Sequence, residues 1–137
     1  MSGVFHGMRI SASGLQAERM RLEVSAGNIA RSGVTRTSDG RPYRRQVISF
    51  TSLLQGAQET GGVRVDAISS DPSPFPRVFR PGHPDADSRG MLELSNVSVP
   101  LEMVELGAAA RAYEANLVAL RTFKELGQRA LSIGTRG

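Results

Sequence analysis

The sequence predicts a mainly α-helical chain with a small β insertion, in which long terminal helices flank a middle segment of short hairpins. Residues 1–32 and 98–137 carry apolar side chains at helical spacing. Residues 33–97 instead carry short runs between turn residues, and five of the seven prolines lie between Pro72 and Pro84. We therefore divide the 137 residues into an N-terminal helix (1–32), a β-rich middle segment (33–97) and a C-terminal helix (98–137).

The N-terminal helix has two apolar rows on roughly opposite sides. The first row consists of Met8, Ala12, Leu15, Leu22, Ala26 and Ile29, and the second of Ile10, Ala17, Met20 and Val24. A surface helix of a globular domain usually has a single apolar face. Two rows therefore predict neighbours on both sides of this helix.

The C-terminal helix has clear start signals. Ser98 or Asn96 is a suitable N-cap, Pro100 suits the first turn, and Glu102 and Glu105 complement the positive end of the helix dipole. A helix of about 35 residues would be roughly 50 Å long, so we expect it to lie along other helices.

Two apolar rows also follow the C-terminal helix. One consists of Met103, Leu106, Ala110, Tyr113, Leu117 and Leu120, and the other of Leu101, Val104, Ala108, Ala112, Ala115, Ala119, Phe123, Leu126, Ala130 and Ile133. The second row has small side chains in its middle. We expect a partner helix to approach closely there.

The middle segment contains four candidate strands, at residues 43–50, 62–68, 77–80 and 90–94. Turn residues separate them, including Asp39-Gly40, Gly61-Gly62 and the proline-rich stretch after Asp71. This segment has too few large apolar side chains to form a sizeable core. We expect small hairpins and extended stretches.

These features predict an assembly subunit and not an enzyme. The chain has no cysteine and two histidines, which leaves little material for a catalytic centre, and we expect no cofactor. Two helices with two apolar rows each leave apolar surface uncovered in a monomer, and such surface usually marks an interface.

Two other functions can be weighed against assembly. His83, Asp85 and Asp87 have the residue types of a metal site, but the surrounding glycine and proline favour a tight turn.

Nucleic-acid binding would suit the net charge of +4, yet the arginines of the N-terminal helix are spread around its circumference. Arg44 and Arg45, beside Tyr43, are interpreted as the charged edge of a hairpin. We therefore expect no nucleic-acid partner, and no apolar run is long enough for a membrane span.

Several sequence motifs resemble one known family. The runs Ser13-Gly14-Leu15-Gln16-Ala17 and Gly27-Asn28-Ile29-Ala30 resemble the N-terminal signature of the bacterial flagellar axial proteins, the rod, hook and hook-associated family. The runs Glu102-Met103-Val104-Glu105-Leu106 and Arg111-Ala112-Tyr113-Glu114-Ala115-Asn116 resemble its C-terminal signature. Middle motifs, such as Asp71-Pro72-Ser73-Pro74 and Pro81-Gly82-His83-Pro84, resemble a proximal rod member in particular. Another proximal rod protein, of the FlgB type, is the alternative within the family.

The resemblance implies a fold, a function and a location. In this family the terminal helices pair as a coiled-coil core that stacks into a tube, with the middle segment outside. The implied function is a structural subunit of the proximal rod, which crosses the periplasm in the flagellar basal body and transmits torque from rotor to hook. The implied partners are copies of the chain, rod proteins of the FlgB, FlgF and FlgG types, the FliE-type adaptor and the flagellar type III export apparatus. Export by that route agrees with a start that lacks a conventional signal peptide.

We expect the residues that make subunit contacts to lie in the two signatures and in the middle segment. The expected assembly interface consists of Leu15, Leu22, Asn28, Ile29, Leu101, Met103, Val104, Ala108, Arg111, Tyr113, Ala115, Asn116 and Leu117. The expected middle-segment contacts are Tyr43, Arg44, Arg45, Pro81, His83, Asp85 and Asp87. Two positions depart from the family pattern: Arg31 stands where an asparagine is common, and Gly107 where a larger residue is common. A glycine inside a helix costs about 1 kcal/mol relative to alanine unless close packing requires it.

Overall fold

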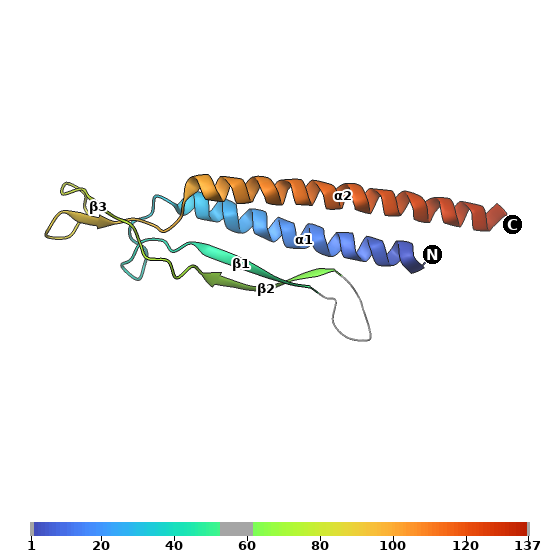
Figure 1. Ribbon diagram of the computed structural model, residues 1–137, viewed down its shortest axis with the longest axis horizontal. Coiled ribbons are helices and arrows are strands. Elements are labelled where there is room, and N and C mark those ends of the chain that lie inside the picture. The colour runs from blue at the N-terminus through green and yellow to red at the C-terminus, as the bar shows by residue number, and fades with distance from the viewer. Residues whose placement is uncertain (1, 53–61, 137) are drawn as a thin grey trace.

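The computed structural model describes residues 2–52 and 62–136, and it confirms the predicted fold class (Figure 1). Within these residues the elements are α1 (Ser2–Arg31), β1 (Gln46–Ser52), β2 (Val63–Ser70), β3 (Arg77–Phe79), β4 (Met91–Glu93) and α2 (Val99–Arg136). All four candidate strands are present, although β1 begins three residues later than predicted. The expected turn at Gly61 falls partly outside the described residues.

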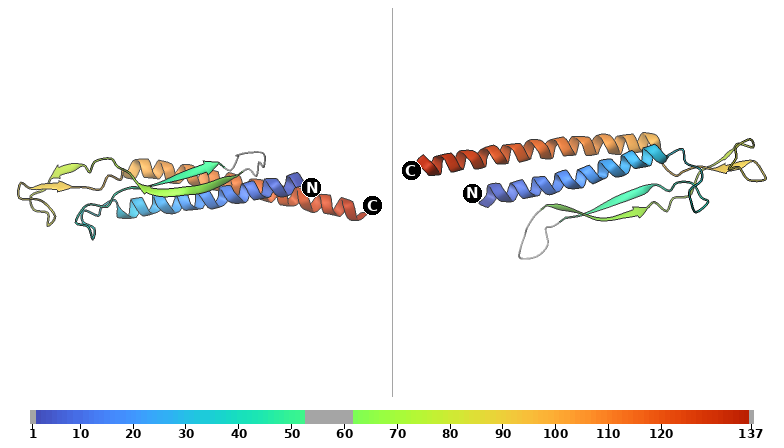
Figure 2. Two further views of the ribbon diagram at one scale, coloured as in Figure 1. Left: turned by 90° about the horizontal axis from the view of Figure 1, so that it is seen from below. Right: turned by 180° about the vertical axis from the view of Figure 1, so that it is seen from behind.

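The molecule is elongated, and over part of its length α2, α1 and the β1–β2 hairpin lie side by side (Figure 1). Helix α1 lies between α2 and the antiparallel β1–β2 hairpin, and the two chain termini lie at the same end (Figures 1 and 2). The small β3–β4 hairpin projects beyond the helices at the opposite end. Helix α1 therefore has neighbours on two sides within the chain, as its two apolar rows predicted.

Small and polar residues form the seam between the antiparallel helices. A Cβ atom added at Gly7 would lie 2.6 Å from the ring of Phe123, and one added at Gly14 would lie 2.8 Å from the Asn116 amide. Ser11, four residues after Gly7 and three before Gly14, is buried, and farther along the seam Arg21 Nη2 lies 2.9 Å from Glu105 Oε2 of α2. The helix backbones approach closely at Gly7 and Gly14 because these residues are small.

The hairpin covers a different face of α1. The backbone N–H of Val63 donates a hydrogen bond to Ser13 Oγ at 3.1 Å, and Ala17 on the same side of α1 is only 3% exposed. Val24 and Ile68 line a small pocket farther along this contact. The second apolar row of α1 thus packs toward the chain's own hairpin.

The described residues bury very little apolar surface. Only Ala17, Leu92 and Ala109 are buried hydrophobic residues, whereas Leu101, Val104 and Ile133 are 67%, 64% and 72% exposed. These three apolar residues therefore lie outside the contact between α1 and α2, whereas Phe123 of the same row lies at the seam against Gly7. Neither helix, over the residues described, has an apolar stretch long enough to span a membrane.

Replacing two glycines of the helix pair by alanine should change the free energy of unfolding in opposite directions. A Cβ atom added at Gly107 would lie 3.6 Å from Arg111 Nη1, an ordinary van der Waals contact, so close packing does not require a glycine there. We expect Gly107→Ala to raise the free energy of unfolding by about 0.5–1 kcal/mol. Gly14→Ala should lower it by about 1 kcal/mol, because displacing Asn116 outweighs the gain in helix propensity. Urea unfolding followed by circular dichroism at 222 nm measures both, and a stabilised Gly14→Ala would contradict the close seam.

Candidate assembly interface

The last turns of α1 are tied to the start of β1 by one buried asparagine. Asn28 is 1% exposed; its Oδ1 accepts hydrogen bonds from Tyr43 Oη at 2.8 Å and from the Gln46 backbone N–H at 3.0 Å. Its Nδ2 donates to the Gln46 carbonyl at 2.9 Å. The amide therefore satisfies both backbone groups of Gln46, as a neighbouring strand would. We predicted Asn28 as an assembly contact, but the fold places it inside the chain.

A second set of polar contacts joins the middle segment to the start of α2. Arg45 Nε donates to Glu102, which is only 1% exposed, and Arg45 Nη1 lies 3.2 Å from Asp71 Oδ2. The bond to Glu102 raises the pKa of Arg45 against the opposing effect of burial. Hydrogen bonds from Ser73, with a smaller contribution from Arg45, lower the pKa of Asp71.

Asn96 completes this set of contacts. Its Oδ1 accepts a hydrogen bond from the Arg45 backbone N–H at 2.7 Å, and its Nδ2 donates to the carbonyls of Asp71 and Ser73. Because the side chain of Asn96 bonds to these other segments, it does not cap α2. The residue directly before α2 is Ser98, whose carbonyl accepts a hydrogen bond from the Glu102 N–H. We call the seven residues Asn28, Tyr43, Arg45, Gln46, Asp71, Asn96 and Glu102 the junction.

The interpretation of Arg44 and Arg45 as a charged hairpin edge is wrong. Both residues precede β1, and both turn inward: Arg44 lies over the ring of Phe75 at 4.2 Å and donates to two carbonyls, those of Asp71 and Ser73. Their partners lie 26 or more residues away along the chain, apart from Gln46, which donates to the Arg44 carbonyl.

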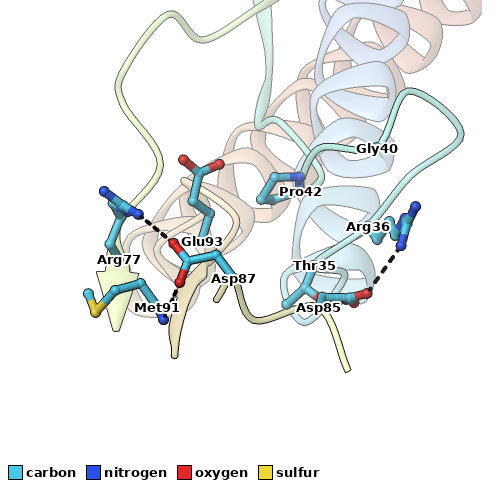
Figure 3. Close-up of a pocket in the computed structure, with 9 residues that line it drawn as sticks. All are labelled: Thr35, Arg36, Gly40, Pro42, Arg77, Asp85, Asp87, Met91 and Glu93. Carbon is cyan, nitrogen blue, oxygen red and sulfur yellow. Dashed lines mark hydrogen bonds and ion pairs between the residues drawn. The ribbon is translucent and has the colours of Figure 1, made fainter. Parts of the chain in front are cut away.

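Beyond the junction, the 32–42 loop packs against the β3–β4 hairpin. Thr35 Oγ1 donates to Asp85 Oδ2 at 2.6 Å, and Arg77 Nη2 lies 3.2 Å from Asp87 Oδ2. A polar pocket of about 240 Å³ lies between the two segments, with these four residues in its walls (Figure 3). We call residues 32–42 and 76–95 the arm.

The predicted turn at residues 83–87 is confirmed. The Asp85 backbone N–H donates to His83 Nδ1 at 3.0 Å, while Asp87 Oδ1 accepts from the backbone N–H groups of Arg89 and Met91. These backbone hydrogen bonds, with that of Met91 contributing most, lower the pKa of Asp87. Within the described residues no group of three or more acidic or imidazole side chains is placed to hold a metal ion.

Apolar surface remains uncovered along both helices. Near the chain termini, Phe5, Met8, Ala12 and Leu120 line an open groove of about 570 Å³. Phe5, Val118, Leu126, Leu131 and Ile133 are large exposed hydrophobic residues outside the predicted interface set. Leu126 and Ile133 belong to the second apolar row predicted for the C-terminal helix, and helical apolar character is the signal that marks the other three.

The structure spreads the predicted interface residues over several environments. Exposed members are Leu101, Met103, Val104, Arg111 and Ala115, and half-buried members are Leu15, Leu22, Ile29, Ala108, Tyr113, Asn116 and Leu117. Asn116 donates to the Ala112 carbonyl within α2. Among the middle-segment residues, Pro81 and Asp87 are exposed, whereas His83 and Asp85 are half-buried.

Comparison with known proteins gives one consistent family. Residues 88–133 match the family described as flagellar basal body rod FlgEFG protein C-terminal. The chain is 44% identical over 125 positions to the flagellar basal-body rod protein FlgC of Yersinia enterocolitica, covering 91% of this chain and 93% of that protein. It is 37% identical to the FlgC proteins of Borreliella burgdorferi and Bacillus subtilis, covering 96% and 95% of this chain and 97% of each relative. The similarity therefore includes both helices and the middle segment.

Replacing Asn28 should destabilise the chain far more than replacing a seam asparagine of α2. Asn28→Ala removes three hydrogen bonds and leaves the backbone groups of Gln46 without partners, which should lower the free energy of unfolding by about 2–4 kcal/mol. Asn116→Ala is the matched control; its one bond, to the Ala112 carbonyl, lies within its own helix, so we expect a loss below about 1 kcal/mol. Denaturant unfolding measures both, and equal losses would contradict the role of Asn28.

Acid should weaken the fold in part through Asp71. Because its pKa is lower in the folded chain than in the unfolded chain, its contribution to stability is present above the unfolded pKa and disappears as pH falls through the folded pKa. We expect Asp71→Asn to be less stable than the parent at neutral pH and equally stable near about pH 2. Urea titrations across this range, with the exposed-site variant Glu114→Gln as control, measure the difference. A constant gap at every pH would contradict this assignment.

Proposed function

Because the chain belongs to the FlgC family of flagellar basal-body rod proteins, it is a structural subunit of the flagellar rod, and we propose that it joins its neighbours through apolar residues that its own fold leaves exposed. The observation that carries this proposal is the inverted distribution of side chains along the helix pair. Serine, asparagine and glutamate are buried at the seam and the junction, while leucine, valine and isoleucine point outward. Contiguous exposed apolar surface of this kind usually marks a protein interface.

The proposed contact surface runs along α2 and the terminal part of α1. On α2 it includes Leu101, Val104, Ala115, Leu126 and Ile133, which are all exposed in the isolated chain. A helix of a neighbouring subunit can approach the alanine-containing middle of this row closely. The monomer leaves the apolar surface of this row in water. Packing against a neighbour would remove that surface from water and stabilise the assembly by roughly 25 cal/mol per Å² buried.

The neighbours that we propose are copies of this chain and rod proteins of the FlgB, FlgF and FlgG types, with a FliE-type adaptor toward the rotor. In this proposal the subunit leaves the cytoplasm through the flagellar type III export apparatus without a cleaved signal peptide. It then forms part of the drive shaft in the periplasm. The arm, with Pro81, His83, Asp85 and Asp87, meets axial neighbours, whereas Tyr43, Arg44 and Arg45 support it from inside the chain.

We propose no catalytic role. His83 is half-buried and its Nδ1 accepts a hydrogen bond from the Asp85 backbone, which makes it part of a turn. The described residues contain no candidate metal cluster that would favour a metal-dependent enzyme. The first test of the function is therefore biochemical: the chain should remain in hook–basal bodies after a high-salt wash, and its deletion should remove rod and hook.

A charge in the exposed row should block assembly without unfolding the subunit. Val104 is 64% exposed and lies in the second turn of α2, where a carboxylate agrees with the helix dipole. We expect Val104→Glu to abolish swimming in soft agar while expression and circular dichroism stay at parent levels. Gln128→Glu, which adds the same charge at an exposed polar position of α2, should swim normally. Normal swimming of Val104→Glu would contradict the proposed surface.

A further inference from the structure

Over residues 2–52 and 62–136, the arm is attached to the rest of the molecule at one place, the junction. Neither β3 nor β4 contacts a helix, and within the described residues the strands of the arm pair only with each other. The chain crosses between the arm and the remaining structure four times: after α1, before β1, after β2 and before α2. Each crossing has a junction residue beside it, and Asn28, Arg45, Asp71 and Asn96 mark the four in that order.

The junction residues are bonded to one another across these crossings. Arg45 connects the crossing before β1 with that after β2 through Asp71, and with α2 through Glu102. Asn96 joins the crossing before α2 to the crossing before β1, through the Arg45 N–H, and to the crossing after β2, through the Asp71 carbonyl. No buried side-chain nitrogen or oxygen atom in the part of the chain that the structure describes lacks a partner. The contacts thus form two satisfied sets, one around Asn28 and one around Arg45, which meet at the consecutive residues Arg45 and Gln46.

The arm itself is internally tied. Thr35 and Arg36 both contact Asp85, which joins the loop to the hairpin, and Leu92 at its centre is only 1% exposed. The Arg80 N–H donates to the Gly90 carbonyl, and a Cβ at Gly90, where φ is +79°, would lie 2.7 Å from Phe79. The arm can therefore keep its own structure when its attachment changes.

We propose that the junction locks the direction of the arm relative to the helix pair, and that losing either the Arg45 ion pairs or the Asn96 hydrogen bonds lets the arm change direction while the helices stay paired. Glu102 is buried and charged, so it requires Arg45 in one geometry, and the planar guanidinium adds direction to the contact. The lock is a property of the single chain. That the lock passes twist from the helices to the arm rests on the proposed function.

Two introduced spin labels can measure the lock. The chain has no natural cysteine, so Ser88→Cys in the arm and Glu114→Cys on α2, both at exposed positions, give one label pair in the full-length protein. We expect a narrow distance distribution in this background. Adding Arg45→Met should broaden the distribution at least twofold, while the circular dichroism signal of the helices is kept.

The matched control is Arg21→Met. Arg21 and Arg45 have side chains 23% and 28% exposed, and each pairs with two carboxylates; those of Arg21 are Glu18 and Glu105, which lie along the helix pair. The control should leave the distribution narrow. An equally narrow distribution in Arg45→Met would overturn the proposal.

A second variant covers the case in which Arg45→Met loses its helices. Asn96→Ala removes the hydrogen bonds that join the crossings but keeps both ion pairs of Arg45. We expect it to broaden the distribution with the helices intact, and a narrow distribution would overturn the proposal. Because the labels report on the purified chain, this result is separate from the swimming assay of Val104→Glu, which tests assembly.

Discussion

The buried carboxylate of Glu102 constrains the structure more than any apolar contact does. A charge at this depth is tolerated only with a bonded counter-ion, and Arg45 provides one from a segment 57 residues away. Removing one member of such a buried pair commonly costs about 3–5 kcal/mol. Since the described residues bury only three hydrophobic side chains, Ala17, Leu92 and Ala109, this pair and the Asn28 amide specify how the middle segment meets the helices.

Burying polar groups leaves the apolar side chains exposed, where the proposed subunit contacts would cover them. The seam of Gly7, Ser11 and Gly14 lets the helices lie close together, but it removes little apolar surface from water. A chain built this way has modest stability alone and gains stability when neighbours cover its rows, since binding to the folded state shifts the equilibrium toward it. The apolar residues that the monomer leaves exposed are thus the ones that neighbours cover in the proposed assembly.

The sequence predicted both helices and all four strands because their periodicity and turn residues are local signals. It did not predict the junction, since Arg45, Asp71 and Glu102 are far apart in the chain and each has an ordinary surface interpretation. Asn28 was identified through a family signature, but a signature does not say whether a residue faces inward or outward. The polar seam repeats at spacings of three and four, so its signal was present; the more hydrophobic rows drew the interpretation away from it.

A drive shaft, the structure to which we propose that this chain belongs, needs contacts of two kinds, and the chain separates them. Apolar contacts are non-directional, so helix rows can adapt to neighbours of different sequence along a shaft. Because apolar contacts are non-directional, they also resist sliding of one helix along another poorly. Hydrogen bonds to charged groups have fixed geometry, and the junction places them where the four crossings meet, which is the position where a twist between arm and helices would act. Replacing the junction by apolar packing could preserve stability, but it would remove the directional restraint on the arm.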